Sequence, residues 1–212
     1  MSNAGVPLMR PLSRALLCAT LLLSLQGCVE MMVGSAVMGA VATADRRTLG
    51  AQTEDKTITV KAELRAPKVA GEDSHVNVAS FNRKVLLTGE VRDEATKAAV
   101  EREVRAIDGV VAVDNQLEVG GPASYTSRSS DALITTKVKA GLVEMKTISA
   151  TSFKVVTERG TVYLMGRVTQ REGQIGADIA RGVSGVLKVV KMFEYITEDE
   201  LKAMQPAKST AL

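Results

Sequence analysis

The chain has 212 residues, of which 45% are hydrophobic and 24% charged, with three Phe, three Tyr and no Trp. Lys and Arg (27) nearly balance Asp and Glu (24), and aromatic residues are scarce, which argues against a nucleic-acid-binding protein. One His and two Cys are too few for a zinc or iron-sulfur site, and the single His leaves at most one candidate for a His-centred catalytic triad. The composition therefore favours one or two small globular domains without metal, cofactor or enzymatic activity.

Residues 1–27 have the pattern of a secretory signal peptide. Arg10 and Arg14 precede the apolar run Ala15–Leu25, which is too short to span a bilayer. The run ends in Leu25-Gln26-Gly27-Cys28, which resembles a bacterial lipobox, so we expect cleavage before Cys28 and acylation of that cysteine. Two or more acyl chains anchor a protein stably. Because no Asp follows Cys28, the segment resembles lipoproteins exported to the outer membrane.

Most of the remaining chain repeats one unit twice. Three sequence blocks recur in the same order at offsets of 76, 77 and 76 residues, which indicates a tandem duplication. The matching pairs are Ile58–Lys61 with Ile134–Lys137, Val85–Val91 with Val162–Val168, and Ile107–Val110 with Val183–Val186.

Each copy is predicted to run helix, strand, strand, helix, strand, from periodicity and β-branched content. In the first copy the elements are a helix containing Ile58 and Ala62, strands around Asn77–Ala79 and Val85–Val91, a helix carrying Val100, Val104 and Ile107, and a strand over Val110–Val119. The second copy begins with a helix that is capped by Asp131 and has Ile134, Val138, Leu142 and Met145 facing the core. Two strands follow, Phe153–Thr157 and Thr161–Val168. A second helix is marked by Ile175, Ile179 and Val183, and the last strand covers Leu187–Ile196.

These elements predict a division of the chain into six segments. They are the signal peptide 1–27, a lipidated and membrane-proximal tether 28–53, a first domain 54–119, a linker 120–130, a second domain 131–196, and a polar C-terminal tail 197–212.

Each copy contains a strand with the pattern V-x-L-x-G-x-V, followed by a helix and then by the pattern G-V-x-x-V. This arrangement resembles the BON domain. The resemblance implies an α+β fold of two tandem BON domains, each α-β-β-α-β with a three-stranded mixed sheet packed on two helices. With the lipobox, it implies a non-enzymatic, lipid-anchored protein on the periplasmic face of the outer membrane. Such proteins bind anionic phospholipid chiefly through the second domain, localise to division sites and support outer-membrane integrity.

Charge separates the two copies independently of that resemblance. Residues 54–119 carry a net charge of −3, whereas residues 128–196 carry +5. Because each Lys or Arg near an anionic membrane contributes roughly 1 kcal/mol, we expect the second copy to be the one that attracts cardiolipin or phosphatidylglycerol.

The first helix of the second copy is the predicted phospholipid-binding site. If Ile134, Val138 and Leu142 face the core, steps of about 100° per residue turn a second stripe of residues to the opposite, outer side of the helix. One lysine lies on each side of this outer stripe. The predicted site residues are Leu133, Thr136, Lys137, Lys139, Ala140 and Val143. Proteins that this chain resembles carry an interfacial Trp where this sequence has Leu133.

Two alternatives to this site remain open at the level of sequence. In the first, Leu133 and Val143 pack against the other domain and the lysines are merely solvated. In the second, the helix binds an envelope protein, so that the chain is a purely protein-binding periplasmic adaptor for outer-membrane assembly or cell-wall remodelling machinery. An enzyme is disfavoured because no nucleophile-base pair or phosphate loop is recognisable.

Overall fold

The structure, a computed structural model, describes residues 45–204. Cys28 and the tether up to residue 44 lie outside the described residues, as does the end of the tail. The elements in chain order are α3 (Leu49–Ala70), β1 (His75–Phe81), β2 (Lys84–Val91), α4 (Glu94–Arg105), β3 (Ala112–Asn115), β4 (Glu118–Val119), α5 (Tyr125–Glu144), the short 3₁₀ helix η2 (Ala150–Ser152), β5 (Phe153–Glu158), β6 (Thr161–Thr169), α6 (Gln170–Gly182), β7 (Lys188–Ile196) and α7 (Glu198–Met204).

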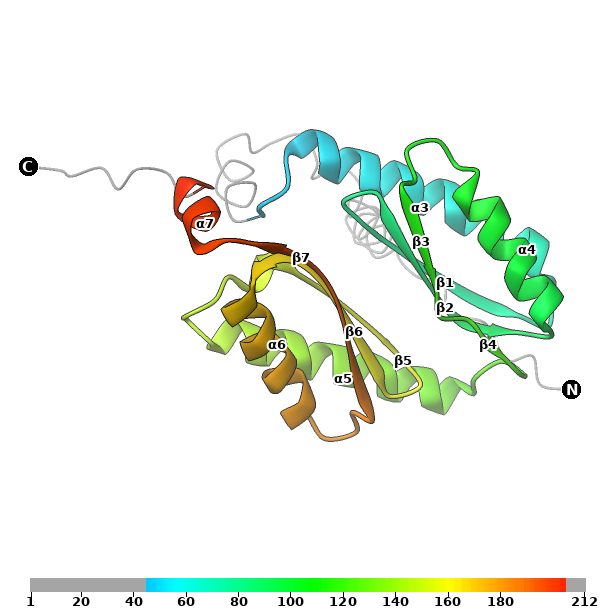
Figure 1. The fold of residues 1–212 in the computed structure, drawn as a ribbon. Coiled ribbons are helices and arrows are strands. Elements are labelled where there is room, and N and C mark those ends of the chain that lie inside the picture. Colours follow the sequence, from blue (N-terminus) through cyan, green and yellow to red (C-terminus); the bar gives the residue numbers. More distant parts are fainter. Residues whose placement is uncertain (1–44, 205–212) are drawn as a thin grey trace, which may run out of the picture. The chain divides into compact units, whose positions relative to one another are not determined.

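Each copy forms a mixed sheet with two helices on one of its faces (Figure 1). In the first sheet β2 pairs antiparallel with β1 and parallel with both β3 and β4. In the second sheet β6 pairs antiparallel with β5 and parallel with β7. The predicted α+β class and the repeated α-β-β-α-β order are confirmed; the second sheet has the predicted three strands, whereas the first has four.

The middle parts of the two central strands are apolar on both faces, which explains the hydrophobic runs Val85–Leu87 of β2 and Val162–Met165 of β6. Successive side chains of a strand point to opposite faces. Val85 and Leu87 of β2 join the core beneath α3 and α4, whereas Leu86 joins a third cluster with residues of the second sheet. That cluster contains Ala79, Phe81, Leu86, Tyr163 and Met165.

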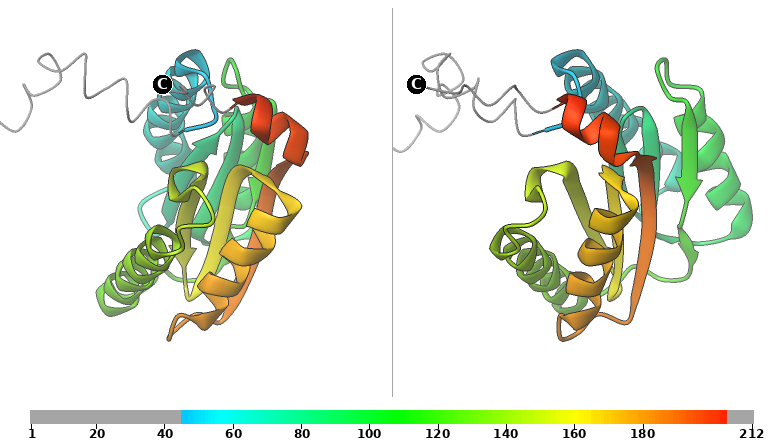
Figure 2. Two further views of the ribbon diagram at one scale, coloured as in Figure 1. Left: turned by 90° about the vertical axis from the view of Figure 1, so that its left-hand side faces the viewer. Right: turned by 60° about the vertical axis from the view of Figure 1, so that its left-hand side comes forward.

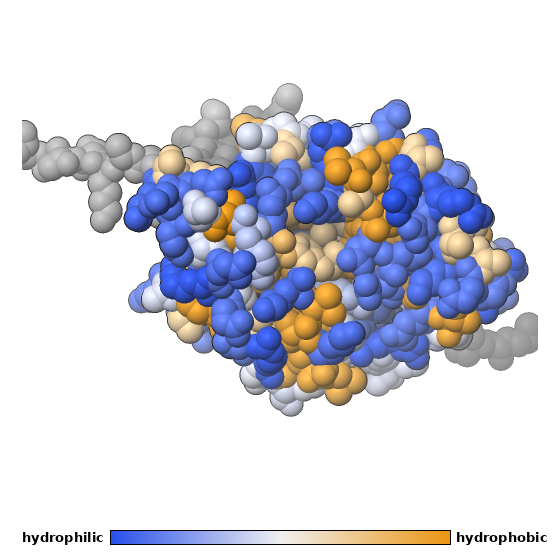
Figure 3. Space-filling view, in the orientation of Figure 1, coloured by the Kyte–Doolittle hydropathy of each residue, from blue (hydrophilic) through white to orange (hydrophobic). Residues whose placement is uncertain are grey.

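The helix-free faces of the two sheets therefore meet in a shared apolar layer, and the helices lie on the outside. The buried residues of all three clusters lie between Ile58 and Ala180, so the chain from Asp45 onward contains complete cores and can fold by itself. The face drawn in Figure 3 is mostly hydrophilic, with hydrophobic residues in separate patches, as expected when the large apolar surfaces are internal.

Polar contacts add to this apolar layer. Asn77 donates to Glu158 at 2.6 Å, and Asn82 donates to Glu194 at 2.6 Å. Ahead of α3, the guanidinium of Arg46 forms two hydrogen bonds of 2.7 Å with the Glu172 carboxylate of α6. The described part of the chain is thus joined across its two copies by both apolar and polar contacts.

The prediction that Asp131 caps α5 is wrong. The helix begins at Tyr125, within the predicted linker, because the Ser124 hydroxyl accepts the N–H of Ser127 and serves as the N-cap. Asp131 is buried inside the helix, where its carboxylate accepts the N–H groups of Arg159 and Gly160 at 2.9 and 2.8 Å.

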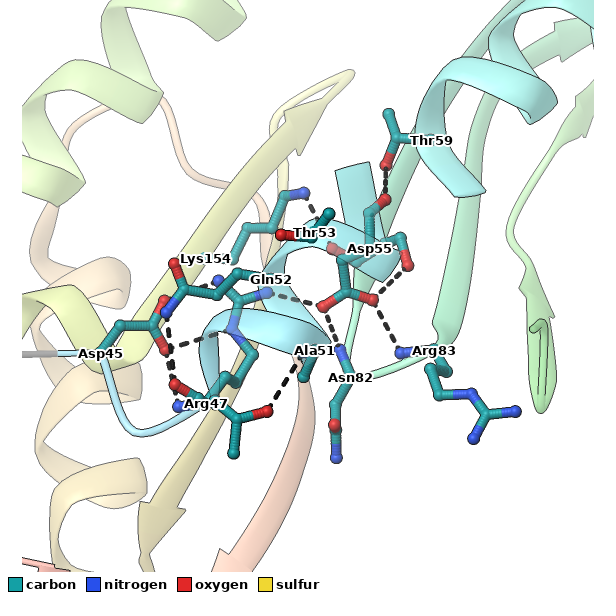
Figure 4. A network of polar contacts seen from close by, with 12 residues as sticks. Asp45, Arg47, Ala51, Gln52, Thr53, Asp55, Thr59, Asn82, Arg83 and Lys154 are labelled. Carbon is teal, nitrogen blue, oxygen red and sulfur yellow. Dashed lines mark hydrogen bonds and ion pairs between the residues drawn. The ribbon is translucent and has the colours of Figure 1, made fainter. Parts of the chain in front are cut away.

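Asp55, which lies 76 residues before Asp131, does the same in the first copy. Its carboxylate accepts the N–H groups of Asn82 and Arg83 at 2.6 and 2.8 Å (Figure 4). Both residues have positive φ, 50° and 67°, the left-handed conformation of a two-residue hairpin turn. In each copy a helix-borne carboxylate therefore fixes the β-hairpin turn against the first helix.

Two further sequence predictions differ from the structure. The strand expected over Val110–Val119 is divided into β3 and β4, because Leu117 turns into the core and the side chain of Asn115 accepts its N–H. The expected polar tail contains α7, which starts after Thr197 and buries Leu201. The cap was visible in the sequence, because Thr197 and Glu200 form the reciprocal hydrogen bonds of a capping box.

Candidate functional site

The outer face of α5 carries all six residues predicted to bind phospholipid. Every one of them is exposed, and the two largest apolar side chains, Leu133 and Val143, are 63% and 70% exposed. The full set is Leu133, Thr136, Lys137, Lys139, Ala140 and Val143. Both views of Figure 2 show α5 on the outside, with no other described element over this face. The alternative in which Leu133 and Val143 pack against the first domain is therefore wrong.

The inner face of α5 explains this exposure. Ile134, Val138 and Leu142 are almost fully buried and pack into the second core, so the helical repeat turns the opposite stripe outwards. Met145, which was expected on the buried side, is 38% exposed because the helix ends before it. Ile148 enters the core in its place.

The two lysines beside the stripe keep their full hydrogen-bonding capacity. Neither amine of Lys137 or Lys139 forms a hydrogen bond or an ion pair with another residue in the range 45–204. On α3, the matching helix of the first copy, Glu63 stands where Lys139 stands on α5. Only the second copy therefore presents an apolar stripe with uncompensated positive charge on both sides.

Tyr125 belongs to the same face, and sequence reasoning missed it by placing residue 125 in the linker. It is 83% exposed in the first turn of α5, and the Arg128 guanidinium lies 4.5 Å from its ring centroid. Steps of about 100° place it on the same side as Val143. Ser124, a favoured capping residue, was the sequence signal for this earlier helix start.

Other kinds of site find no support in the described segment. Among residues 45–204 no group of three or more His, Cys, Asp or Glu side chains is placed to hold a metal ion. The described helices also include none that is long and apolar enough to cross a membrane. The outer face of α5 is thus the surface of the second domain that best fits the predicted site.

A family model of the BON domain matches residues 55–121 and 130–197, one match for each α-β-β-α-β unit. The chain belongs to the BON-domain family. Its two matched segments contain both sheets, α4 and α6, and most of α3 and α5.

Three relatives cover most of the chain. The outer membrane lipoprotein DolP of Haemophilus influenzae is 37% identical over 174 residues, or 81% of this chain and 90% of that protein. The 21 kDa hemolysin of Actinobacillus pleuropneumoniae is 30% identical over 72% of this chain and 79% of its own length. Osmotically-inducible protein Y of Escherichia coli is 27% identical over 64% of this chain and 70% of its own length.

Proposed function

We propose that this protein is a non-enzymatic lipoprotein of the outer membrane that binds anionic phospholipid through the outer face of α5. The observation that carries the proposal is the exposed apolar stripe of Leu133, Ala140 and Val143 between the unpaired Lys137 and Lys139. An amphipathic helix of this kind lies in the plane of a membrane interface, with its apolar side towards the acyl chains.

The magnitudes favour useful binding on a protein already tethered to the membrane. Burial of a Leu side chain contributes roughly 1.5 to 3 kcal/mol, and each lysine near anionic headgroups roughly 1 kcal/mol. Leu133 lacks the amphipathic ring that the resembling proteins carry at this place, and Tyr125 supplies such a ring two turns earlier on the same face. Tyr side chains are favoured at the depth of the headgroups.

The similarity to DolP supports an outer-membrane location, because that relative is named an outer membrane lipoprotein. In this chain the anchor is Cys28 of the lipobox-like segment, which directs the folded domains to the periplasmic face. We further propose that lipid binding concentrates the protein at division sites and that it supports the integrity of the envelope. No catalytic step is part of this function.

Cosedimentation with liposomes tests the proposal. The chain from Asp45 onward, without its acyl anchor, is mixed with vesicles of phosphatidylethanolamine with or without cardiolipin or phosphatidylglycerol. We expect binding only to the anionic vesicles, weakened by added salt. Leu133→Glu and the double variant Lys137→Glu/Lys139→Glu should each reduce the partition coefficient by about tenfold or more.

The first copy provides a matched control. Leu64 of α3 is 61% exposed, almost the same as Leu133, and lies on the outer face of the corresponding helix. Leu64→Glu should leave binding unchanged if α5 alone meets the membrane. If the wild-type chain stays in the supernatant at low salt, the lipid proposal is wrong, and the outer face of α5 becomes the candidate docking surface for an envelope protein.

A further inference from the structure

A cleft of about 560 Å³ lies where the first and second copies meet, on the side of β1 and β5. Its walls come from α3 and β1 of the first copy and from α5, η2 and β5 of the second. Its volume falls within the range of ordinary small-molecule sites, roughly 300–1,000 Å³. Phe81, Phe153 and Val155 provide a buried apolar lining.

Positive charge dominates the polar lining of this cleft. Lys56, Lys139 and Lys154 all line it, each from a different element. None of the three forms an ion pair with a carboxylate in the described part of the chain. Arg47 also lines the cleft, but its guanidinium is paired with Asp55 at 2.7 Å.

Asp55, the acidic residue of the lining, is already saturated. Besides Arg47, it accepts hydrogen bonds from the Ser80 hydroxyl and from the N–H groups of Asn82 and Arg83, all at 2.6 to 2.8 Å (Figure 4). Burial acts to raise the pKa of Asp55, but these hydrogen bonds and the ion pair together lower it. The carboxylate is therefore engaged by the first copy and is not free to neutralise the three lysines.

Lys154 is the least exposed of the three lysines. Figure 4 shows it reaching from β5 towards the network around Asp55, where its amine donates to the Ser80 carbonyl at 3.0 Å. Burial lowers the pKa of this amine, and the positive charges of Arg47 and Lys139 act in the same direction, whereas Asp55 and Glu63 oppose them. An ammonium has three N–H donors, so two remain for a ligand.

We propose that this cleft binds a phosphate ester, with the phosphate held by Lys56, Lys139 and Lys154 and its glycerol or acyl portion lying on Phe81 and Phe153. A phosphate accepts several charge-assisted hydrogen bonds at once and would offset the charge that the lysines concentrate here. The phosphate can come from a phospholipid headgroup or from a soluble phosphate ester. The cleft shares Lys139 with the proposed membrane-binding face of α5, but it does not include the apolar residues Leu133 and Val143, so a soluble phosphate ester can occupy it without the membrane contact.

Titrations of the chain from Asp45 onward, followed by calorimetry and by amide NMR shifts, test this site. The probes are inorganic phosphate, glycerol 3-phosphate, and a short-chain phosphatidylglycerol below its micelle concentration, all at matched ionic strength. Binding of all three identifies a site for soluble phosphate esters as well as lipid. Binding of the short-chain lipid alone identifies a headgroup site. In both cases the amides of Ser80 and Lys154 should shift.

Two lysine variants and one control complete the test. Lys56→Gln, at an exposed position that leaves the fold intact, and Lys154→Gln should each weaken binding about tenfold. Lys68→Gln, which removes an exposed charge from the far end of α3, should change it less than about twofold. Failure of all three probes to bind, or equal loss in Lys56→Gln and Lys68→Gln, would overturn the proposal.

Discussion

The carboxylate that fixes the hairpin turn of each copy offers a test with a built-in comparison. Asp55 has four partners, namely Ser80, Asn82, Arg83 and Arg47. Its counterpart in the second copy has two, the N–H groups of the turn residues. At about 1 kcal/mol for each hydrogen bond lost, Asp55→Ala should cost about 4 kcal/mol of unfolding free energy, and Asp131→Ala about 2 kcal/mol.

Urea unfolding of the chain from Asp45 onward measures both costs. Glu54→Ala is the matched control, because Glu54 neighbours Asp55 but forms only a half-exposed ion pair with Arg83 at 3.4 Å, worth at most about 1 kcal/mol. Where Asp55→Ala proves too unstable to refold, Asp55→Asn, which keeps one acceptor oxygen, should show an intermediate loss. A cost for Asp131→Ala equal to or above that for Asp55→Ala would refute the reasoning.

The pH dependence of the same variant provides a second readout. Hydrogen bonds and the Arg47 pair outweigh burial and hold the pKa of Asp55 below its ordinary value. A lowered pKa in the folded state contributes stability above the unfolded pKa, about 3.9, and this contribution is lost as the pH falls through the folded value. The stability difference between wild type and Asp55→Ala should therefore be constant near neutrality and shrink below about pH 4.

Two further predictions concern other buried positions. Burial raises the pKa of Glu158 despite the hydrogen bond from Asn77, so the wild type loses stability as the pH rises from about 4.3 through the folded pKa. In thermal melts, the stability of Glu158→Gln relative to wild type should be higher at pH 7 than at pH 4. The same difference in stability between variant and wild type at both pH values would contradict this. Gly89 has a φ of 112°, and an added Cβ would lie 2.0 Å from the His75 carbonyl oxygen. Gly89→Ala should cost about 3 kcal/mol in urea unfolding, whereas Gly120→Ala, with open space around it, should stay within about 0.5 kcal/mol.

The exposed stripe of α5 was predictable because it depends only on the helical repeat. Once Ile134, Val138 and Leu142 are assigned to the core, the direction of Leu133 and Val143 follows from geometry alone. The helix start was not predicted, because Asp131 is also a good capping residue when only its neighbours in sequence are considered. Its actual partners, Arg159 and Gly160, are 28 and 29 residues away and meet it only after folding.

The sequence by itself determined the tandem α+β architecture, the separation of charge between the copies and the direction of the α5 stripe. These properties follow from local periodicity and composition, which do not require distant contacts. Only the tertiary structure decided what lies against the second apolar face of β2 and β6, since an apolar run shows that a face is buried but not by what. The phosphate cleft arises in the same way, because its lysines come from α3, α5 and β5 and become neighbours only when the two sheets pack together.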